Sequence, residues 1–419
     1  MSVNPFEIKP QKIESSFRSW AQLAQKPYDK NEVDPYTKVR IILMNGTEFE
    51  ANWFKHQLAR HCTDNDIRRE IALCRRVEQQ QQKAISSLKP LDETILEHTI
   101  GYEQLAVDLT AIMAQNEKDK NVKKALDFAL LEDFDHLYRF SDLLEMEQGV
   151  KGERLVGCYT EIMPGRPTIS EHRHPFDDVR KHINNTNATP LTKLNACIIT
   201  AAEQQTMNYY MNVGCFHPTD LGRKLYTEIA MIEEQHVSQY ESLNDSSATW
   251  LEKALMHEYA ECYLYYSMYE DETDERVKAL WERHFNDEVA HLHHAVSLLQ
   301  KYEKKDREQV IPDGTFPTLL SFNNNVKNNK AYVRNVIKKT VMNTAVLEDY
   351  APVCELPKNS RFHKYNDTVN KSANNVASHK VIEKYIDLNG KDYRYEEKPH
   401  PTPELRDNTK DNTCVGRCC

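Results

Sequence analysis

Glycine is scarce in this chain, with 11 glycines among 419 residues. Loops that cradle nucleotide phosphates need several glycines at fixed spacing, and neither a Walker pattern nor a GxGxxG pattern is present. Long apolar runs are lacking too, since nothing approaches the ~20 residues of a membrane span. Residues 1–25 contain no apolar segment between a basic start and a cleavage site, so no signal peptide is expected. These absences argue against a nucleotide-binding or membrane protein and favour a cytoplasmic location.

The chain also lacks an excess of positive charge. Its net charge is −10, which argues against a nucleic acid as partner because such binding depends on neutralising phosphates. Its ten cysteines form no CxxC pair, and a reducing cytosol would keep them as thiols. Three of them close the sequence, as Cys414, Cys418 and Cys419, where they could bind soft metals or exchange disulfides. No function is assigned to these three.

In the middle of the chain, apolar residues recur at the spacing of an α-helix over many long segments. Polar or proline-containing turns separate these segments, so the sequence predicts an all-α fold. Residues 148–189 contain several glycines and prolines and are expected to form a long crossover. The predicted helices span residues 64–88, 92–115, 122–147, 190–213, 220–242, 247–269 and 274–304.

The two ends of the chain are patterned differently. Residues 38–44 are interpreted as a short strand, with Asn45-Gly46 as a turn. One more helix is predicted at residues 330–346, and the rest of the C-terminal part is expected to be irregular: extended, docked on a neighbour or partly disordered. The predicted division is therefore an N-terminal extension (1–63), a helical bundle (64–305) and a long polar tail (306–419).

One ligand pattern occurs three times on the predicted helices. It is Asp/Glu-x-x-His, in which the acid and the imidazole share a face because residues i and i+3 are neighbours on a helix. A single copy is a weak signal, since acids and histidines meet at this spacing by chance. The three copies are Asp133/His136, Glu233/His236 and Glu288/His291.

A glutamate precedes the acid of each copy by 30 residues. The middle of each interval is polar or contains proline, as expected of a turn between two helices. Two arms of equal length folded at such a turn bring the first glutamate level with the acid and the histidine. The sequence thus predicts three αα-hairpins, each presenting two carboxylates and one imidazole. The first glutamates are Glu103, Glu203 and Glu258.

The candidate ligands interrupt the apolar face of each helix. In the second hairpin, Ile199 and Met207 lie on the same stripe as Glu203, at helical spacing. Burying an ionised carboxylate without a partner costs several kcal/mol or more. Several buried together require compensating positive charge, which bound metal ions supply directly. A network of buried ion pairs is the alternative interpretation.

This pattern resembles the ferritin-like superfamily, particularly its rubrerythrin-type dinuclear carboxylate members. There, one helix of each hairpin supplies a Glu, the other supplies Glu-x-x-His, and two hairpins enclose two metal ions. The resemblance covers about half of the chain, roughly residues 92–304. It implies a ferritin-like antiparallel bundle that holds two iron ions, or manganese, per site. Three features depart from the family: Asp133 replaces the usual Glu, a third hairpin is present, and the paired-CxxC rubredoxin module is missing.

The connections predict which hairpins share a site. Two hairpins around one site run in opposite senses, which requires a long crossover such as residues 148–189. The link after Ser242 is only a few residues, so the third hairpin would run in the same sense as the second. The main site is expected to comprise Glu103, Asp133, His136, Glu203, Glu233 and His236.

The third hairpin leaves its ligands without an assigned partner. Glu258, Glu288 and His291 would supply a second site, for instance one across a dimer axis, or a vestigial one. Whether Glu97, Glu252 or Glu261 also act as ligands stays open at this point.

By resemblance, the expected function is that of an oxidoreductase acting on dioxygen or peroxide. A homo-oligomer, such as a dimer, and a separate electron donor are the expected partners. A non-catalytic metal-binding or storage protein is one alternative, although the crossover and a tail of ~100 residues argue against a storage cage on size grounds. A helical scaffold with buried ion pairs and no metal is the other.

Overall fold

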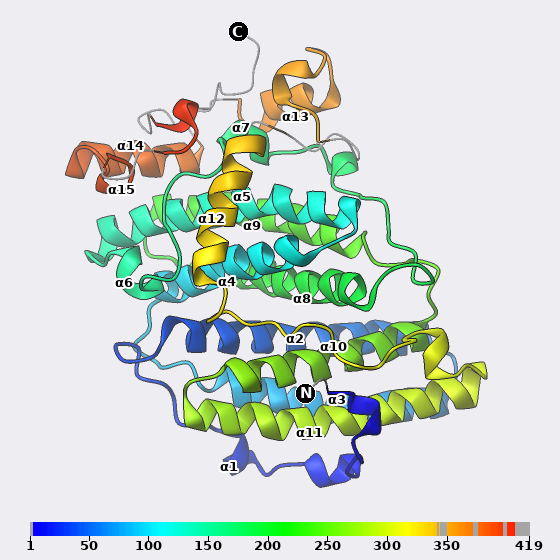
Figure 1. Ribbon diagram of the computed structural model, residues 1–419. Coiled ribbons are helices and arrows are strands. Elements are labelled where there is room, and N and C mark those ends of the chain that lie inside the picture. Colours follow the sequence, from blue (N-terminus) through cyan, green and yellow to red (C-terminus); the bar gives the residue numbers. More distant parts are fainter. Residues whose placement is uncertain (1–2, 342, 344–349, 372–375, 397–399, 407–419) are drawn as a thin grey trace. The chain divides into compact units, whose positions relative to one another are not determined.

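The computed structural model describes residues 3–341, 343, 350–371, 376–396 and 400–406 (Figure 1). Within these residues the regular structure is helical throughout, and the sole β-type pairing is an isolated bridge between Asn343 and Pro352. The predicted all-α class is therefore confirmed. Among the same residues, no helix is long and apolar enough to cross a membrane.

The chain divides into two compact units. Helix α8 (Pro190–Val213) belongs to both, because the division falls between Gln205 and Thr206. The first unit comprises Met1–Glu93, His182–Gln205 and Asn244–Asn324, and the second comprises Thr94–Lys181, Thr206–Leu243 and Asn325–Cys419.

Two helical hairpins form most of the first unit. Helix α2 (Pro35–His61) packs on α3 (Asn65–Ser86) and on α10 (Trp250–Asp271), while α11 (Glu275–Leu298) packs on α10 and α3. The side chain of Asp64 caps α3 by accepting from the backbone N–H groups of residues 66 and 67. Asp274 caps α11 in the same way. Such caps satisfy N–H groups that the helix itself leaves unpaired, which fixes where each helix begins.

The predicted strand at 38–44 and the turn at Asn45-Gly46 are wrong, because both lie inside α2. The side chain of Asp34 accepts from the backbone N–H of Tyr36, and Pro35 opens the helix at a position where its missing N–H costs nothing. Gly46 marks a close helix contact and not a turn. A Cβ atom there would come within 2.5 Å of the Gln205 side chain.

The second unit contains the hairpin of α4 (Ile95–Asn116) and α5 (Lys120–Gln148), together with α9 (Asp220–Glu241), which packs on α5. Its crossover carries two short helices, α6 (Gly152–Val156) and α7 (Thr168–Glu171). Nearly every residue of α4 is buried. The predicted helices of the bundle are thus confirmed, with ends that differ by a few residues; the last begins at Glu275 and finishes in a π-helical turn, Leu299–Glu303.

The C-terminal part of the second unit is more helical than predicted. The helix expected at 330–346 is α12 (Val326–Thr340), and α14 (Ala377–Asn389) packs on α5 and α9. Two further helices follow the same pattern, α13 (Arg361–Val369) and α15 (Tyr393–Glu396). The prediction of irregular structure is therefore wrong for α13, α14 and α15. Cys414, Cys418 and Cys419 lie outside the described residues.

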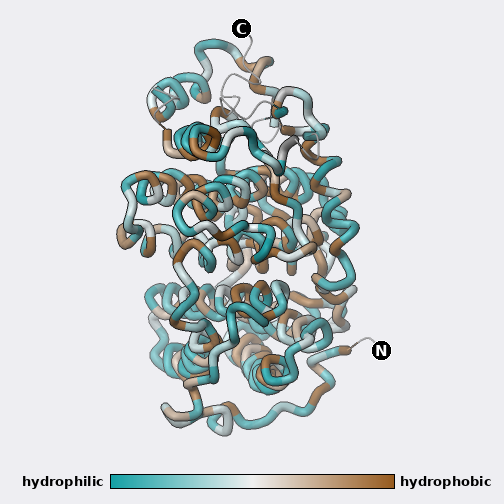
Figure 2. The backbone as a smooth tube through the Cα atoms, turned by 90° about the vertical axis from the view of Figure 1, so that its left-hand side faces the viewer, coloured by the Kyte–Doolittle hydropathy of each residue, from teal (hydrophilic) through white to brown (hydrophobic). Residues whose placement is uncertain are grey.

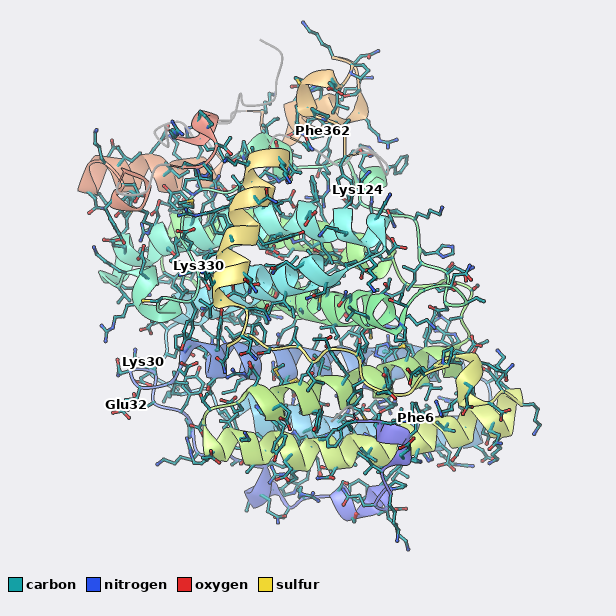
Figure 3. The ribbon with its side chains drawn as sticks, viewed as in Figure 1. Phe6, Lys30, Glu32, Lys124, Lys330 and Phe362 are labelled. Carbon is teal, nitrogen blue, oxygen red and sulfur yellow. The ribbon has the colours of Figure 1, made fainter. Side chains whose placement is uncertain are left out.

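Hydrophobic and hydrophilic residues are interspersed along the helices, as expected where helices bury one face and expose another (Figure 2). In each unit an aromatic side chain anchors a peripheral segment, and these two residues, Phe6 and Phe362, are labelled in Figure 3. In the first unit, Phe6 stacks on Tyr259 of α10 with ring centroids 5.9 Å apart. In the second, Phe362 of α13 is fully buried and packs with Ile169 and Val353.

Candidate metal centre

The second unit brings together five of the predicted ligands. Glu103 lies on α4, Asp133 and His136 on α5, and Glu233 and His236 on α9, all of them buried. The hairpin turn between α4 and α5 explains the level placement of Glu103 and Asp133, and the packing of α5 on α9 brings the two acid-histidine pairs face to face. These five residues are called the α5–α9 cluster: Glu103, Asp133, His136, Glu233 and His236.

Glu233 lies at the centre of this cluster. Its Oε1 is 3.0 Å from Nδ1 of His136, and its Oε2 is 3.3 Å from Nδ1 of His236. Nδ1 of His236 is also 3.2 Å from Oδ1 of Asp133. Potential ligand atoms of Asp133, Glu233 and His236 lie within 4.8 Å of one another, as do those of Glu103, Glu233 and His136. Two overlapping groups therefore share one carboxylate, as a bridged pair of cations would require.

Each histidine of the cluster has a second acid on its far side. Nε2 of His236 is 2.6 Å from Oε2 of Glu132, and Nε2 of His136 is 3.8 Å from Oε2 of Glu171. Histidines that bind metals commonly donate their other ring N–H to a carboxylate, which fixes the ring orientation. The ring geometry thus leaves both Nδ1 atoms facing the shared acids.

A buried arginine supports this outer layer. Arg173 donates from its η1 nitrogen to Glu132 at 3.1 Å and from Nε to Asp178 at 2.9 Å. The phenol of Tyr210 donates to Glu103. The sequence predictions missed Arg173, Glu132 and Asp178. Arg173 and Asp178 lie in the irregular crossover, which has no periodicity to reveal them, whereas Glu132 could have been noticed as the acid beside Asp133.

Burial raises the pKa values of the acids in the cluster, whereas the two imidazoles lower them. Burial raises the pKa of Glu103 well above its usual value, and it does the same for Glu171. Burial would also raise the pKa of Glu233, but hydrogen bonds with His136 and His236 lower it below the usual 4.5. Burial alone would lower the pKa of His136, yet bonds to Glu171 and Glu233 raise it well above 6.5. The metal-free cluster therefore holds protons that cations could replace.

The metal-free protein is accordingly expected to lose stability as the pH rises from 5 to 8. Groups with raised pKa bind protons on folding, at about 1.4 kcal/mol per pH unit for each proton. The contribution of His136 is fully present below pH 6.5 and is lost as the pH rises through its folded-state pKa. Glu233 acts in the opposite sense, because its contribution is present above pH 4.5 and is lost in more acidic solution.

Urea unfolding in the presence of a chelator checks this expectation. The free energy of unfolding should fall over this pH range, and Glu103→Gln, which cannot take up the proton, should make the fall shallower. A fall of the same steepness in Glu103→Gln would contradict the raised pKa assigned to Glu103.

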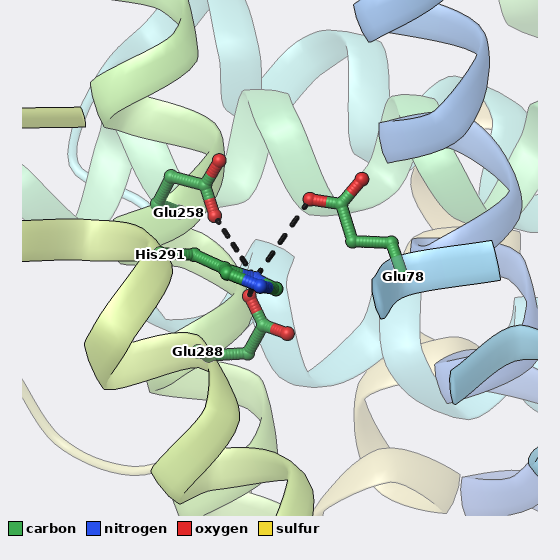
Figure 4. Close-up of side chains that lie close together, drawn as sticks. All are labelled: Glu78, Glu258, Glu288 and His291. Carbon is green, nitrogen blue, oxygen red and sulfur yellow. Dashed lines mark hydrogen bonds and ion pairs between the residues drawn. The ribbon is translucent and has the colours of Figure 1, made fainter. Parts of the chain in front are cut away.

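The first unit contains a similar group of buried side chains. Nδ1 of His291 is 3.1 Å from Oε2 of Glu288, 3.9 Å from Oε2 of Glu258 and 4.0 Å from Oε1 of Glu78 (Figure 4). Glu258 lies on α10, Glu288 and His291 on α11, and Glu78 on α3. Three further buried residues complete what is called the α3–α11 cluster: Glu48, Lys55, Glu78, Glu258, Glu261, Glu288 and His291.

A fourth hairpin, which the sequence predictions missed, supplies part of this cluster. Glu78 follows Glu48 by 30 residues, the same interval as in the other three hairpins, and the third residue after Glu78 is Gln81. Gln81 donates to Oε1 of Glu288 at 2.6 Å. The pattern was missed because a glutamine stands where the others have a histidine. The 30-residue interval alone does not single it out, because the same interval also joins Glu117 to Glu147 and Glu228 to Glu258.

The two clusters are built from equivalent positions, 55 residues apart in the sequence. Tyr265 donates to Glu48 just as Tyr210 donates to Glu103. The chain therefore contains an internal repeat. Each unit carries at least one helical hairpin with candidate ligands at equivalent positions. The equivalent pairs are Glu48 and Glu103, Glu78 and Asp133, Gln81 and His136, Tyr265 and Tyr210, Glu288 and Glu233, and His291 and His236.

The remaining candidate residues lie on α4, α8 and α10. Glu97 and Glu252 complete the capping boxes of α4 and α10 with Thr94 and Thr249, and they serve the helix ends. Glu261 is buried in the α3–α11 cluster, where it lies near Glu288 and Lys55. Glu203 is 1% exposed and lies on the part of α8 that belongs to the first unit.

Neither cluster resembles an ordinary surface network of acids. Charged carboxylates that are fully buried need nearby cations or protons, and in both clusters acids outnumber lysines and arginines. Carboxylate and imidazole groups together suit iron, manganese or zinc better than metals that prefer soft thiolate or thioether ligands. The two clusters thus offer ligand atoms of the kind that divalent cations bind, and in the α5–α9 cluster two overlapping ligand groups share Glu233.

Comparison with known proteins gives no relative for this chain. No family model matches it, and neither the curated proteins nor the solved structures contain a significant match.

Proposed function

We propose that the second unit binds two iron or manganese ions in the α5–α9 cluster. The observation that carries the proposal is the pair of overlapping ligand groups that share Glu233, each with its own imidazole. His236 would hold one ion together with Asp133, and His136 would hold the other together with Glu103. Glu203 is proposed as a further carboxylate, because it stands 30 residues before Glu233 as Glu103 does before Asp133.

The proposed activity is that of an oxidoreductase acting on dioxygen or peroxide. A pair of redox-active ions would supply the electrons for that reaction, and a separate electron donor would restore them. The protein's own groups would position the pair: Glu132 is hydrogen-bonded to the far nitrogen of His236, and Glu171 lies beside that of His136. The hydroxyl of Tyr210 on α8, which donates a hydrogen bond to Glu103, would hold that carboxylate in place.

Elemental analysis of the full-length chain, purified without added metal, tests the proposal. About two iron or manganese ions per chain are expected, as for a dinuclear carboxylate site. The iron- or manganese-loaded protein should then consume dioxygen or hydrogen peroxide. A chain that contains no transition metal and takes up neither metal on reconstitution would refute the proposal.

A non-catalytic metal-binding or storage protein is the second candidate. The internal repeat favours it in one respect, since the chain carries two buried acidic clusters and not one. Many bound ions per chain without turnover of dioxygen or peroxide would support storage. The homo-oligomer expected from the sequence stays a prediction, and the molecular mass in solution checks it.

A further inference from the structure

Lys55 lies among the acids of the α3–α11 cluster. Its side chain is 1% exposed, and its Nζ pairs with Oε1 of Glu78 and lies 2.7 Å from Oε1 of Glu258. The same two glutamates form the candidate metal group with Glu288 and His291. The ammonium group therefore contacts two of the four residues that a metal ion would bind in this unit.

An ammonium and a divalent cation compete for such a position. The lysine has three N–H donors and no lone pair while it is charged, so it cannot act as a ligand. A divalent ion on the oxygens of Glu78 and Glu258 would lie close to Nζ, and the repulsion between the two charges is poorly screened in a buried site. Occupation by Lys55 and occupation by a metal ion thus exclude each other.

The second unit has neither a lysine nor a glutamine at the positions equivalent to Lys55 and Gln81, the two N–H donors that contact the acids of the α3–α11 cluster. The residue 55 positions after Lys55 is Thr110, which carries no charge. The counterpart of Gln81 is His136, so the second unit has an imidazole where the first has an amide that donates to Glu288. Among the differences between the clusters, Lys55 places an ammonium group where the second unit has an uncharged residue, and Gln81 places an amide donor where the second unit has a candidate metal ligand.

The ligand groups of the first unit are otherwise intact. Oε2 of Glu258, both carboxylate oxygens of Glu261 and Nε2 of His291 are buried without a hydrogen-bond partner among the described residues. All three side chains are at least 97% buried. These atoms would be available to a cation if the ammonium were removed.

We infer that in the first unit the Lys55 ammonium takes the place of a metal ion, and that removing its charge opens the α3–α11 cluster to one divalent transition-metal ion. The first unit is then a closed copy of the metal centre, in which an internal cation holds the acids together. This inference goes beyond the proposed function and does not depend on whether the second unit binds metal.

The test uses the full-length chain with Glu233→Ala and His236→Ala, so that metal in the second unit does not contribute. After incubation with Mn²⁺ alone and removal of the excess, elemental analysis should find no bound manganese. Adding Lys55→Thr, which installs the residue of the second unit, should raise the content to about one ion per chain. Adding His291→Ala to that variant should abolish the gain.

Lys38 provides a matched control, because it is a buried lysine of the same helix that pairs with Glu93 away from the cluster. Lys38→Thr should bind no manganese. Lys55→Met, which keeps most of the side chain's length without its charge, replaces Lys55→Thr if the threonine variant does not fold. Manganese bound at the first unit while Lys55 is present would overturn the inference, and so would folded Lys55 variants that gain none. The first result says nothing against metal in the second unit, so the two proposals fail separately.

Discussion

Replacing Glu233 with alanine is expected to abolish metal binding by the second unit. Glu233 belongs to both overlapping ligand groups and contacts Nδ1 of both His136 and His236. Its removal takes one ligand from each ion and the only carboxylate that both groups share. Affinity for iron or manganese should fall by at least ~100-fold, since substitutions in the outer layer of a metal site already cost roughly 10–100-fold.

Glu234→Ala is the matched control, because Glu234 is the next residue of the same helix and is exposed. It should leave the metal content unchanged. Elemental analysis and competition with a chelator measure both variants, and circular dichroism verifies that they are folded. Retention of the full metal content by folded Glu233→Ala would show that the α5–α9 cluster is not the metal site.

The helical hairpins could be predicted because their signals are local. Asp64, Asp119, Thr219 and Asp274 each stand where a helix begins, and each caps that helix in the structure. Equal arm lengths then set Glu103 level with Asp133, without knowledge of any tertiary contact. This is why the three predicted acid-histidine pairs are found at buried positions facing other acids.

The fourth hairpin could not be predicted in the same way. Its β-branched run and its Asn45-Gly46 pair are typical of a strand and a hairpin turn. The helix forms because tertiary packing overrides that local preference: Gly46 lets the Gln205 side chain approach, and Gln205 donates to the carbonyl of Ile42. The pairing of α2–α3 with α10–α11 joins segments about 200 residues apart, which no local pattern reveals.

The outer layer of the α5–α9 cluster was beyond prediction for a different reason. Glu171 and Arg173 belong to a connection whose path is set by the helices it crosses, and a crossover has no periodic face to show which side chains turn inward. Their importance is visible only in the contacts. Arg173 is fully buried, and its guanidinium contacts Glu132, Asp178 and the ring of Phe128.

These contacts predict that Arg173→Met is among the most destabilising single changes in the second unit. Burial would raise the pKa of Glu132, but the adjacent guanidinium holds it below its usual value, so this acid is charged in the folded protein. Without Arg173, Glu132 stays buried beside His236 with much of its compensating charge gone. Removing one partner of a buried ion pair typically costs about 3–5 kcal/mol.

Arg334→Met is the matched control. Arg334 forms a two-pronged pair with Glu161, at 2.7 and 2.6 Å, but its side chain is 47% exposed. A solvated pair of this kind contributes about 0–1 kcal/mol, so the same substitution should have little effect. Urea unfolding of the chelator-treated variants compares the two losses directly.

The two arginine variants should also differ in metal binding at the proposed site. Because Glu132 holds Nε2 of His236, Arg173→Met should weaken metal binding as well as stability, whereas Arg334→Met should change neither. If both arginine variants lost the same small amount of stability, the buried ion pair would contribute no more to the free energy of unfolding than a surface pair does. The outer layer would then not be what orients His236 toward Asp133 and Glu233.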